Sequence, residues 1–479
     1  MNFAGLLFLL VAHYITGRGI LQLFRLQLDN VVTICCSFII SVPVLSLAPC
    51  ILQLLKMPIT GTTVFAAISV FTALCSIPLF INFKMPRFQK IAMPKLYEWP
   101  AFLVIIFFIV MSLWRCYYMP PYSRDMLSGP ELIAEYTVRE HTMINSVFNI
   151  DLSTSNNYHK SPFVTSLQII YKLLVFQYGQ LWLSILFLSF TTFIYTMLRS
   201  RLHPLLAGFF LVLFTTVPEL YAYTFVILYD YSNMVFFFLG FYFLTMYLQN
   251  DRQNDLAFSI FLFGLATYIR TESLILIAMM TPLLMIHLYK KKLPLKTSAL
   301  RLLLFLAVPA AFYYLCINVF VAHFVPIKMN IADNINPNLG DLSALIQRLS
   351  DIVSLLIFSF AGSEYYGYFF FIFTAILCFD IIWMRKFNKE AVYALYGVAV
   401  IYFGLGFIGY LLPLADLGNT TKRGFFKAIP MMLLYMANSG AILRLSQGIK
   451  NWEIGSLHKA KPATVKTTPQ NTVTKKAKK

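Results

Sequence analysis

The sequence predicts an all-α integral membrane protein with about 13 transmembrane helices. Two observations lead to this fold class. Hydrophobic residues make up 59% of the 479 positions and charged residues only 12%, whereas a soluble domain is about half apolar and about a quarter charged. The apolar residues also gather into stretches close to the roughly 20 residues that cross a bilayer as a helix. Lipid is therefore the expected solvent for most of the chain.

The candidate spans follow one another along the chain, and some are short enough that their neighbours must bury their ends. They cover residues 3–14, 31–55, 61–81, 99–118, 181–198, 204–216, 234–248, 256–268, 274–289, 302–320, 368–383, 391–412 and 425–443. We expect a three-span N-terminal segment over residues 1–95 and a transmembrane core over residues 96–445. Residues 446–479 end in Lys mixed with Thr, Pro and Ala, which is typical of a disordered cytoplasmic tail that contacts anionic lipid.

Positive charge predicts which connectors face the cytoplasm. The net charge is +18, and the Lys and Arg residues gather in short connectors and in the tail, as the positive-inside rule describes. These residues are Lys84, Arg87, Lys90 and Lys95; Lys290, Lys291, Lys292, Lys296 and Arg301; Arg385, Lys386 and Lys389; and Lys475, Lys476, Lys478 and Lys479. Because spans of membrane length separate these groups, they do not form the basic face of a nucleic-acid-binding protein. We expect no nucleic-acid partner and an N-terminus outside the cytoplasm.

This topology places two large connectors on the extracytoplasmic side of the membrane. The first covers residues 119–180 and the second covers residues 321–367. Each contains weakly amphipathic stretches, such as residues 343–360, which we expect to form helices that lie flat in the interface. Because no soluble domain follows the last span, any catalysis is expected at the membrane surface.

The first connector carries the candidate catalytic residue. Asp125 stands a few residues beyond the fourth span and is expected near the headgroup level. A carboxylate held there can accept a proton from a hydroxyl that attacks a membrane-anchored substrate, so Asp125 is the predicted general base. Glu131 and Glu135 are four residues apart and share one helix face. Glu131 is a candidate for substrate binding, although a solvated surface helix explains this pair better.

Two ionisable residues interrupt the apolar run GLATYIRTESLILIA. Arg270 and Glu272 are costly at such a position, where ionisable residues tend to be functional or paired. The planar guanidinium group suits a phosphate because it offers several donors in a fixed geometry. Arg270 is therefore a candidate phosphate-binding residue, and the alternative is a structural pair with Glu272 that reaches the interface.

A second basic element, GNTTKRGFFKAIP, places Lys422 and Arg423 on the extracytoplasmic side, against the general charge trend. They are candidates for binding an anionic ligand, although contact with lipid headgroups also explains them. Glu219 and Asp230 flank a short connector on the same side and are expected to line the same cavity. The extracytoplasmic histidines and the seven cysteines show no metal-ligand spacing. We expect no metal site and no cofactor, and the sequence leaves a divalent metal open.

The order of these features resembles the GT-C superfamily of polytopic glycosyltransferases. The likeness is to bacterial members similar to dolichyl-phosphate-mannose–protein mannosyltransferases and to the lipid A aminoarabinose transferase. It rests on an early acid in the first long loop (Asp125), then HKSPFVTSLQIIYKLLVFQYGQ, LRSRLHPLLAGFFLVLFTTVPEL and MVFFFLGFYFL, and then YIRTES around Arg270. The likeness covers residues 99–289 and extends in looser form to residue 443. The chain departs from the family at Met126, where many relatives have a second acid, at Ser161, where they have proline, and in its three extra N-terminal spans.

The resemblance implies a GT-C-like fold and the transfer of a sugar from a polyprenyl-phosphate-linked donor. The acceptor would be a glycan, a lipid or a protein at the extracytoplasmic face, implied to be the periplasmic side of a bacterial cytoplasmic membrane. Asp125 would be the general base on the acceptor hydroxyl, and one such displacement would invert the anomeric carbon. The implied donor-phosphate ligands are Arg270, Lys422 and Arg423, and the implied substrate-binding residues are Glu131, Glu219, Asp230, Glu272, His159 and Lys160.

Three other functions stay open. An oligosaccharide ligase or polymerase acting on lipid-linked glycans would depend on extracytoplasmic Arg and His residues and not on Asp125. A lipid or sugar transporter or flippase would be favoured by repeated halves with matching broken helices, and the sequence has no convincing internal repeat. A non-catalytic relative that binds lipid is the third alternative.

Overall fold

The structure is a computed structural model that describes residues 2–26, 28–81, 95–150, 160–326, 335–337, 340–412 and 415–460. The described residues form helices and connecting turns and no strand, so the all-α prediction is confirmed for this part of the chain. The N-terminal segment contains α1 (Phe3–Leu23), α2 (Asn30–Leu45), α3 (Leu47–Leu54) and α4 (Gly61–Ile81). The short η1 (Leu96–Glu98) and the long α5 (Trp99–Tyr118) follow.

The first large connector forms short helices, as the sequence predicts, and leads into the central helices. The connector holds α6 (Arg124–Leu127), α7 (Pro130–Glu140), α8 (Val147–Ile150) and α9 (Phe163–Leu174). The central helices are α10 (Leu181–Arg199), α11 (Pro204–Thr215), α12 (Pro218–Ala222), α13 (Tyr229–Asn250), α14 (Gln253–Ile269), α15 (Ser273–Lys290) and α16 (Leu295–Tyr314).

The C-terminal part begins with η3 (Leu315–Val321) and α17 (Ala322–Phe324), which continue the line of α16. The second connector then contains α18 (Leu342–Asp351), η5 (Ile352–Ile357) and α19 (Phe360–Tyr366). The remaining elements are α20 (Phe369–Phe379), η6 (Asp380–Met384), α21 (Lys389–Leu411), η7 (Leu417–Thr421), α22 (Lys422–Gly424), η8 (Phe425–Lys427), α23 (Ala428–Asn438) and α24 (Gly440–Ala460).

The chain is a multi-pass membrane protein, but a count of 13 spans is not confirmed. Among the described residues, nine helices are long and apolar enough to cross a bilayer, and the count reaches 11 if each of two bent helix pairs is one span. Some of the predicted spans are helices of less than membrane length. Pro204 starts α11 and Pro218 starts the next helix, so α11 has only 12 residues. The first helix is longer than the predicted span 3–14, because α1 extends to Leu23.

The centre of the bundle is α13, with 89% of its membrane-length window buried, whereas only 11% of α4 is buried. α13 packs along α14 at Gly240, where an added Cβ would lie 2.7 Å from the Phe263 ring. This close approach requires glycine, because any larger residue would push the two helices apart. The exposed apolar face of α4 is suited to contact with lipid.

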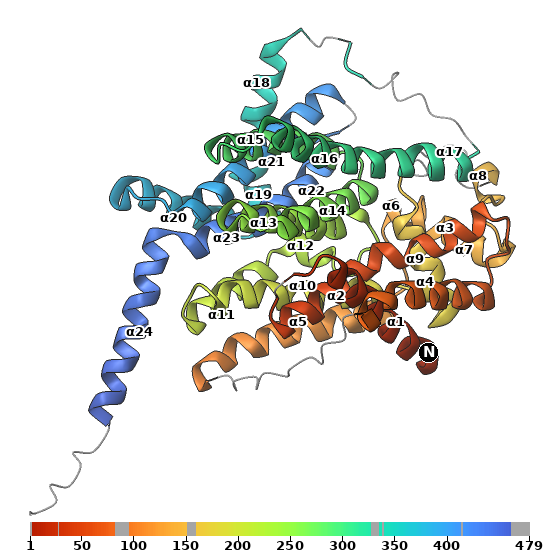
Figure 1. Ribbon diagram of the computed structural model, residues 1–479, viewed down its shortest axis with the longest axis horizontal. Helices are drawn as coiled ribbons and strands as arrows, with labels where there is room; N and C mark the ends of the chain where they lie inside the picture. Colours follow the sequence, from red (N-terminus) through yellow and green to blue (C-terminus); the bar gives the residue numbers. More distant parts are fainter. Residues whose placement is uncertain are drawn as a thin grey trace, which may run out of the picture.

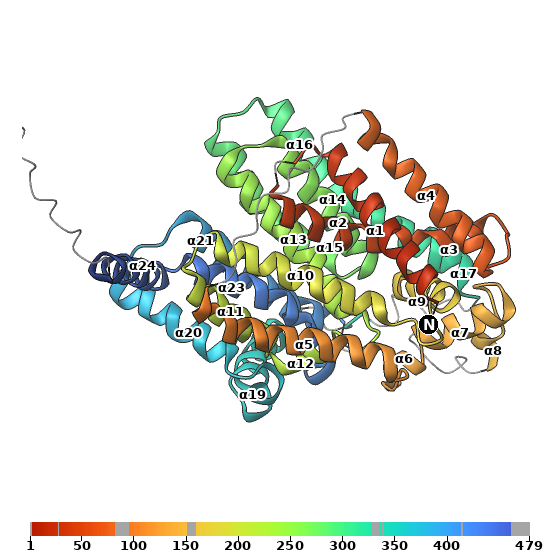
Figure 2. The ribbon, with the colours of Figure 1, turned by 90° about the horizontal axis from the view of Figure 1, so that it is seen from below.

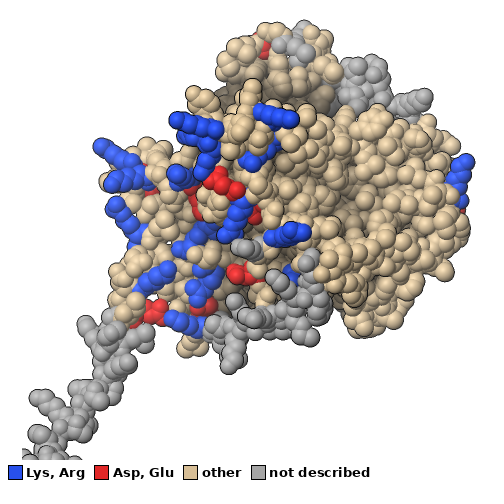
Figure 3. Space-filling view, viewed as in Figure 1, with Lys and Arg blue, Asp and Glu red and all other residues tan. Residues whose placement is uncertain are grey.

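Most of the long helices, α24 excepted, run broadly along the molecule (Figures 1 and 2). In Figure 3, most visible Lys and Arg side chains gather where α15 ends and α24 begins. We call this the basic end. α15 begins beside Arg270 and Glu272 and ends at Lys290, which places the two termini about 27 Å apart. The candidate site residues therefore lie one membrane-spanning helix away from the basic end.

Candidate functional site

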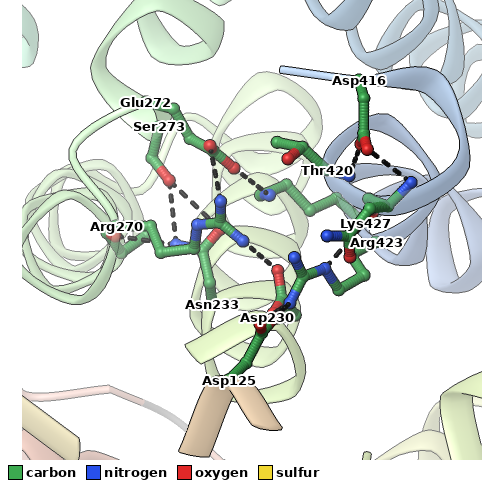
Figure 4. Close-up of polar contacts among 12 residues, drawn as sticks. Asp125, Asp230, Asn233, Arg270, Glu272, Ser273, Asp416, Thr420, Arg423 and Lys427 are labelled. Atoms are coloured by element: carbon green, nitrogen blue, oxygen red, sulfur yellow. Dashed lines mark hydrogen bonds and ion pairs between the residues drawn. The ribbon is translucent and has the colours of Figure 1, made fainter. Parts of the chain in front are cut away.

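Six ionised side chains from five separate elements meet at one site, which we call the charged cluster (Figure 4). Asp125 comes from α6, Asp230 from the first turn of α13, and Arg423 and Lys427 from α22 and η8. Arg270 and Glu272 come from the three-residue link between α14 and α15. Five of these six residues were predicted as site residues, and the structure brings all five together.

The link between α14 and α15 presents Arg270 and Glu272 to the cluster. Arg270 has an extended backbone, with φ −141° and ψ 118°, so the helix stops there and its side chain turns toward α13. Its guanidinium group forms an ion pair with Asp230 through Nη1, and its Nη2 lies 2.9 Å from Glu272 Oε2. The acidic side chain of Asp230 also lies in the first turn of α13, where it is favoured by the helix dipole.

A buried amide holds this link in place. Asn233, one turn after Asp230, donates from Nδ2 to the carbonyl oxygen of Ala266 at 2.8 Å and to Ser273 Oγ at 2.9 Å. These two contacts tie the last turn of α14 and the first residue of α15 to α13. Asn233 and Ser273 were not predicted from the sequence, because an Asn or Ser in an apolar run is common in membrane helices.

Arg423 connects the first connector with the centre of the bundle. Its Nη1 lies 3.0 Å from Asp125 Oδ2 and 3.8 Å from Asp230 Oδ2, and its Nε donates to the carbonyl oxygen of Asn419. Figure 4 shows Asp230 between the guanidinium groups of Arg270 and Arg423. The side chain of Asp125 is 33% exposed, compared with 8% for Arg423 and 2% for Asp230. Asp125 is therefore the carboxylate that a substrate can reach most easily.

Lys427 closes the cluster from η8 and was missed in the sequence. Its Nζ lies 3.2 Å from Glu272 Oε1, and only 1% of its side chain is exposed. Lys427 stands four residues after Arg423, a spacing that puts two side chains on the same helix face. This spacing is the signal that identifies it, although the surrounding phenylalanines favour the start of an apolar span.

Burial and neighbouring charges set the ionisation of Glu272 and of Lys160. Burial alone would raise the pKa of Glu272, but the positive charges of Arg270 and Lys427 hold it below its ordinary value. Burial, followed by the charge of Arg270, lowers the pKa of Lys160 to about 8. Glu272 is therefore anionic at neutral pH, and Lys160 exchanges its proton close to physiological pH.

Two other predicted residues form a pair of their own. Lys422 Nζ lies 2.8 Å from Glu219 Oε1 and 4.1 Å from the centre of the Tyr365 ring. Tyr366 donates a hydrogen bond to the carbonyl oxygen of Lys422 at 2.8 Å. The second connector, through α19, thus fixes the segment that also carries Arg423.

Glu131 and Lys160 lie on other elements. Glu131 lies 2.7 Å from Lys172 Nζ and accepts a 2.6 Å hydrogen bond from Gln168, so it joins α7 to α9. Burial raises the pKa of Glu131 more than the charge of Lys172 lowers it. Lys160 lines a small apolar pocket, with its Nζ 5.9 Å from the centre of the Tyr229 ring. The predicted substrate-binding residue His159 lies outside the described residues.

In the part of the chain that the structure describes, no group of three His, Cys, Asp or Glu side chains is arranged to hold a metal ion. Comparison of the chain with models of known protein families, with curated proteins and with solved structures finds no match. The charged cluster is therefore the part of the molecule that indicates its function. It combines an accessible carboxylate with two guanidinium groups and a buried ammonium group, a set that can accept a proton and bind a phosphate.

Proposed function

We propose that the chain is an inverting membrane glycosyltransferase. It transfers a sugar from a polyprenyl-phosphate-linked donor to the hydroxyl group of an acceptor, on the side of the bilayer opposite the basic end. The observation that supports this proposal is the juxtaposition of the accessible Asp125 with the guanidinium groups of Arg423 and Arg270 around one shared carboxylate, Asp230.

The proposed reaction assigns a role to each side of the cluster. The acceptor oxygen forms a bond to the anomeric carbon of the donor as its proton passes to the Asp125 carboxylate. Arg423 holds that carboxylate through Oδ2, so Oδ1 is the oxygen that we assign to the proton. The bond between the anomeric carbon and the phosphate oxygen breaks, and its electron pair leaves with the polyprenyl phosphate.

The leaving phosphate gains one negative charge in this step, and the site needs cations to stabilise it. We assign this role to Arg270 and Arg423, with Lys160 contributing while it is protonated. Both arginines are partly neutralised by Asp230 and by their other carboxylate partners. A phosphate group would therefore bind by sharing these cations, and the carboxylates would hold the guanidinium groups in position beforehand.

A transfer assay tests the proposal. Membranes containing the wild type, Asp125→Asn or Arg270→Lys are compared at matched expression, with a radiolabelled polyprenyl-phosphate sugar and native membrane acceptors. Loss of the general base is expected to lower transfer by about 100-fold or more, and Arg270→Lys is expected to lower it because Lys lacks the planar fork. Asp351→Asn on α18 is the control and should transfer at the wild-type rate.

Two outcomes would contradict the proposal. Full transfer by Asp125→Asn would mean that the acceptor is activated elsewhere, as in a ligase or polymerase that does not need this residue. Movement of a lipid across the bilayer by the wild type, with no transfer of sugar, would instead identify a flippase.

A further inference from the structure

The last helix, α24, lies across the basic end rather than along the bundle. It follows α23 after a bend of 55° at Ser439. In Figure 1 it runs away from α20 and α23, nearly at right angles to the long helices, and in Figure 2 it is seen almost end-on. A helix with this orientation at the end of a bundle is suited to lie in the plane of the bilayer surface.

The polar side of α24 is used for attachment to the protein. Ser446 Oγ accepts a 2.8 Å hydrogen bond from the backbone nitrogen of His203, and Glu453 Oε2 lies 3.1 Å from His203 Nε2. Glu453 also forms an ion pair with Lys95. These contacts fix the polar side of α24 against the starts of α11 and η1.

The apolar side of α24 faces outward. Ile442, Leu445, Ile449 and Trp452 recur every three or four residues and, together with side chains of α20, line an apolar groove of about 880 Å³. Leu445 is 51% exposed and Trp452 75% exposed. An amphipathic helix on a soluble protein packs its apolar side against the protein, whereas α24 packs its polar side and exposes its apolar side. The groove is therefore suited to be covered by an apolar partner.

The charges around the groove identify that partner. Arg444 lines the groove. In the sequence, residues 461–479 add six Lys and no acidic residue. A second copy of the chain would bring the same positive charge to this end and be repelled. An anionic lipid complements both features, since it offers an acyl chain and a negative headgroup.

We propose that the groove between α20 and α24 binds an anionic phospholipid of the leaflet at the basic end. One acyl chain lies along Ile442, Leu445 and Ile449, and the headgroup phosphate lies beside Arg444. The site would anchor α24, and through Glu453 and His203 the starts of α11 and η1, to the surface of an anionic membrane. This site is independent of the glycosyl-transfer proposal.

Quenching of Trp452 fluorescence tests this site. The full-length protein is reconstituted in phosphatidylcholine nanodiscs that contain equal mole fractions of either brominated phosphatidylglycerol or brominated phosphatidylcholine. Subtraction of the signal of Trp452→Phe isolates the contribution of Trp452. We expect stronger quenching by brominated phosphatidylglycerol, with a preference that falls about fivefold in Arg444→Gln. Lys296→Gln, which removes a charge on α16, is the matched control and should keep the wild-type preference.

Equal quenching by the two brominated lipids, or the same preference in Arg444→Gln as in the wild type, would overturn the proposal. Absence of quenching by both lipids would also overturn it, because another part of the protein or a second copy would then cover Trp452. A variant that ends at residue 460 separates these occupants, since quenching restored by the truncation assigns the groove to the tail.

Discussion

Replacement of Asp230 with Asn tests whether the charged cluster is one coupled, buried network. The side chain of Asp230 is 2% exposed, contacts Arg270, and lies 3.8 Å from Arg423 Nη1. The substitution keeps the size of the side chain but removes the charge that both guanidinium groups share. Removal of one partner from a buried ion pair costs about 3–5 kcal/mol. Because Arg270 keeps Glu272 and Arg423 keeps Asp125, we expect a cost near the lower limit, about 3 kcal/mol.

The cost can be measured as a loss of thermal stability in detergent. Heated samples are separated by size-exclusion chromatography, and the temperature that leaves half of the protein monodisperse is recorded. Proteins of about 150–250 residues lose about 2–4 °C per kcal/mol, and the smaller value suits this longer chain. Asp230→Asn should therefore lower the midpoint by about 6 °C, while Asp351→Asn on α18 should leave it unchanged.

A second variant separates loss of charge balance from loss of packing. Asp230→Asn combined with Arg423→Gln removes the cation that the single substitution leaves undercompensated, so the double variant should regain part of the lost stability. If the single variant melts like the wild type, Asp230 does not couple the two arginines. If the double variant is less stable than the sum of both single variants, the cation is not the source of the cost.

Two further predictions concern the lysines of the site. Lys160 has a lowered pKa of about 8, so its charge destabilises the folded state below about pH 8, and this cost disappears as the pH rises toward the ordinary lysine value near 10.4. Thermal melts should therefore show that Lys160→Met gains stability over the wild type at about pH 7 and loses that advantage near pH 10. Lys427→Met removes a buried partner of Glu272 and should cost about 1–3 kcal/mol in the same heating assay, since Glu272 keeps Arg270.

The membrane character and the helical class could be predicted from the sequence because composition and span length determine them directly. The number of spans could not, because tertiary contacts set where some helices end. α20 and the π-helical η6, for example, together cover residues 369–384, close to the predicted span 368–383 but shorter than a membrane-length helix. η7 starts where Asp416 accepts backbone hydrogen bonds from Asn419 and Thr420.

Some residues of the site could be predicted from the sequence and some of their contacts could not, for different physical reasons. Arg270 and Glu272 stand out because charge within an apolar run is costly. The pairing of Arg423 with Asp125 could not be predicted, because 298 residues separate them along the chain. Glu131 was predicted to bind substrate on the strength of its place in the first connector, but the structure places it against Lys172 and Gln168, in contacts that a helical pattern does not reveal.

The N-terminal spans contribute to the site through polar contacts inside the bundle. Ser46, between α2 and α3, shares a 3.4 Å hydrogen bond with Tyr268, which stands two residues before Arg270. His13 on α1 lies 3.1 Å from the hydroxyl group of Tyr171 on α9, the helix that follows Lys160. Because apolar contacts between helices in lipid gain little from burial, such hydrogen bonds fix the relative positions of α1, α9 and α14. The N-terminal spans therefore help to determine where Arg270 and Lys160 lie, although neither residue belongs to the N-terminal segment.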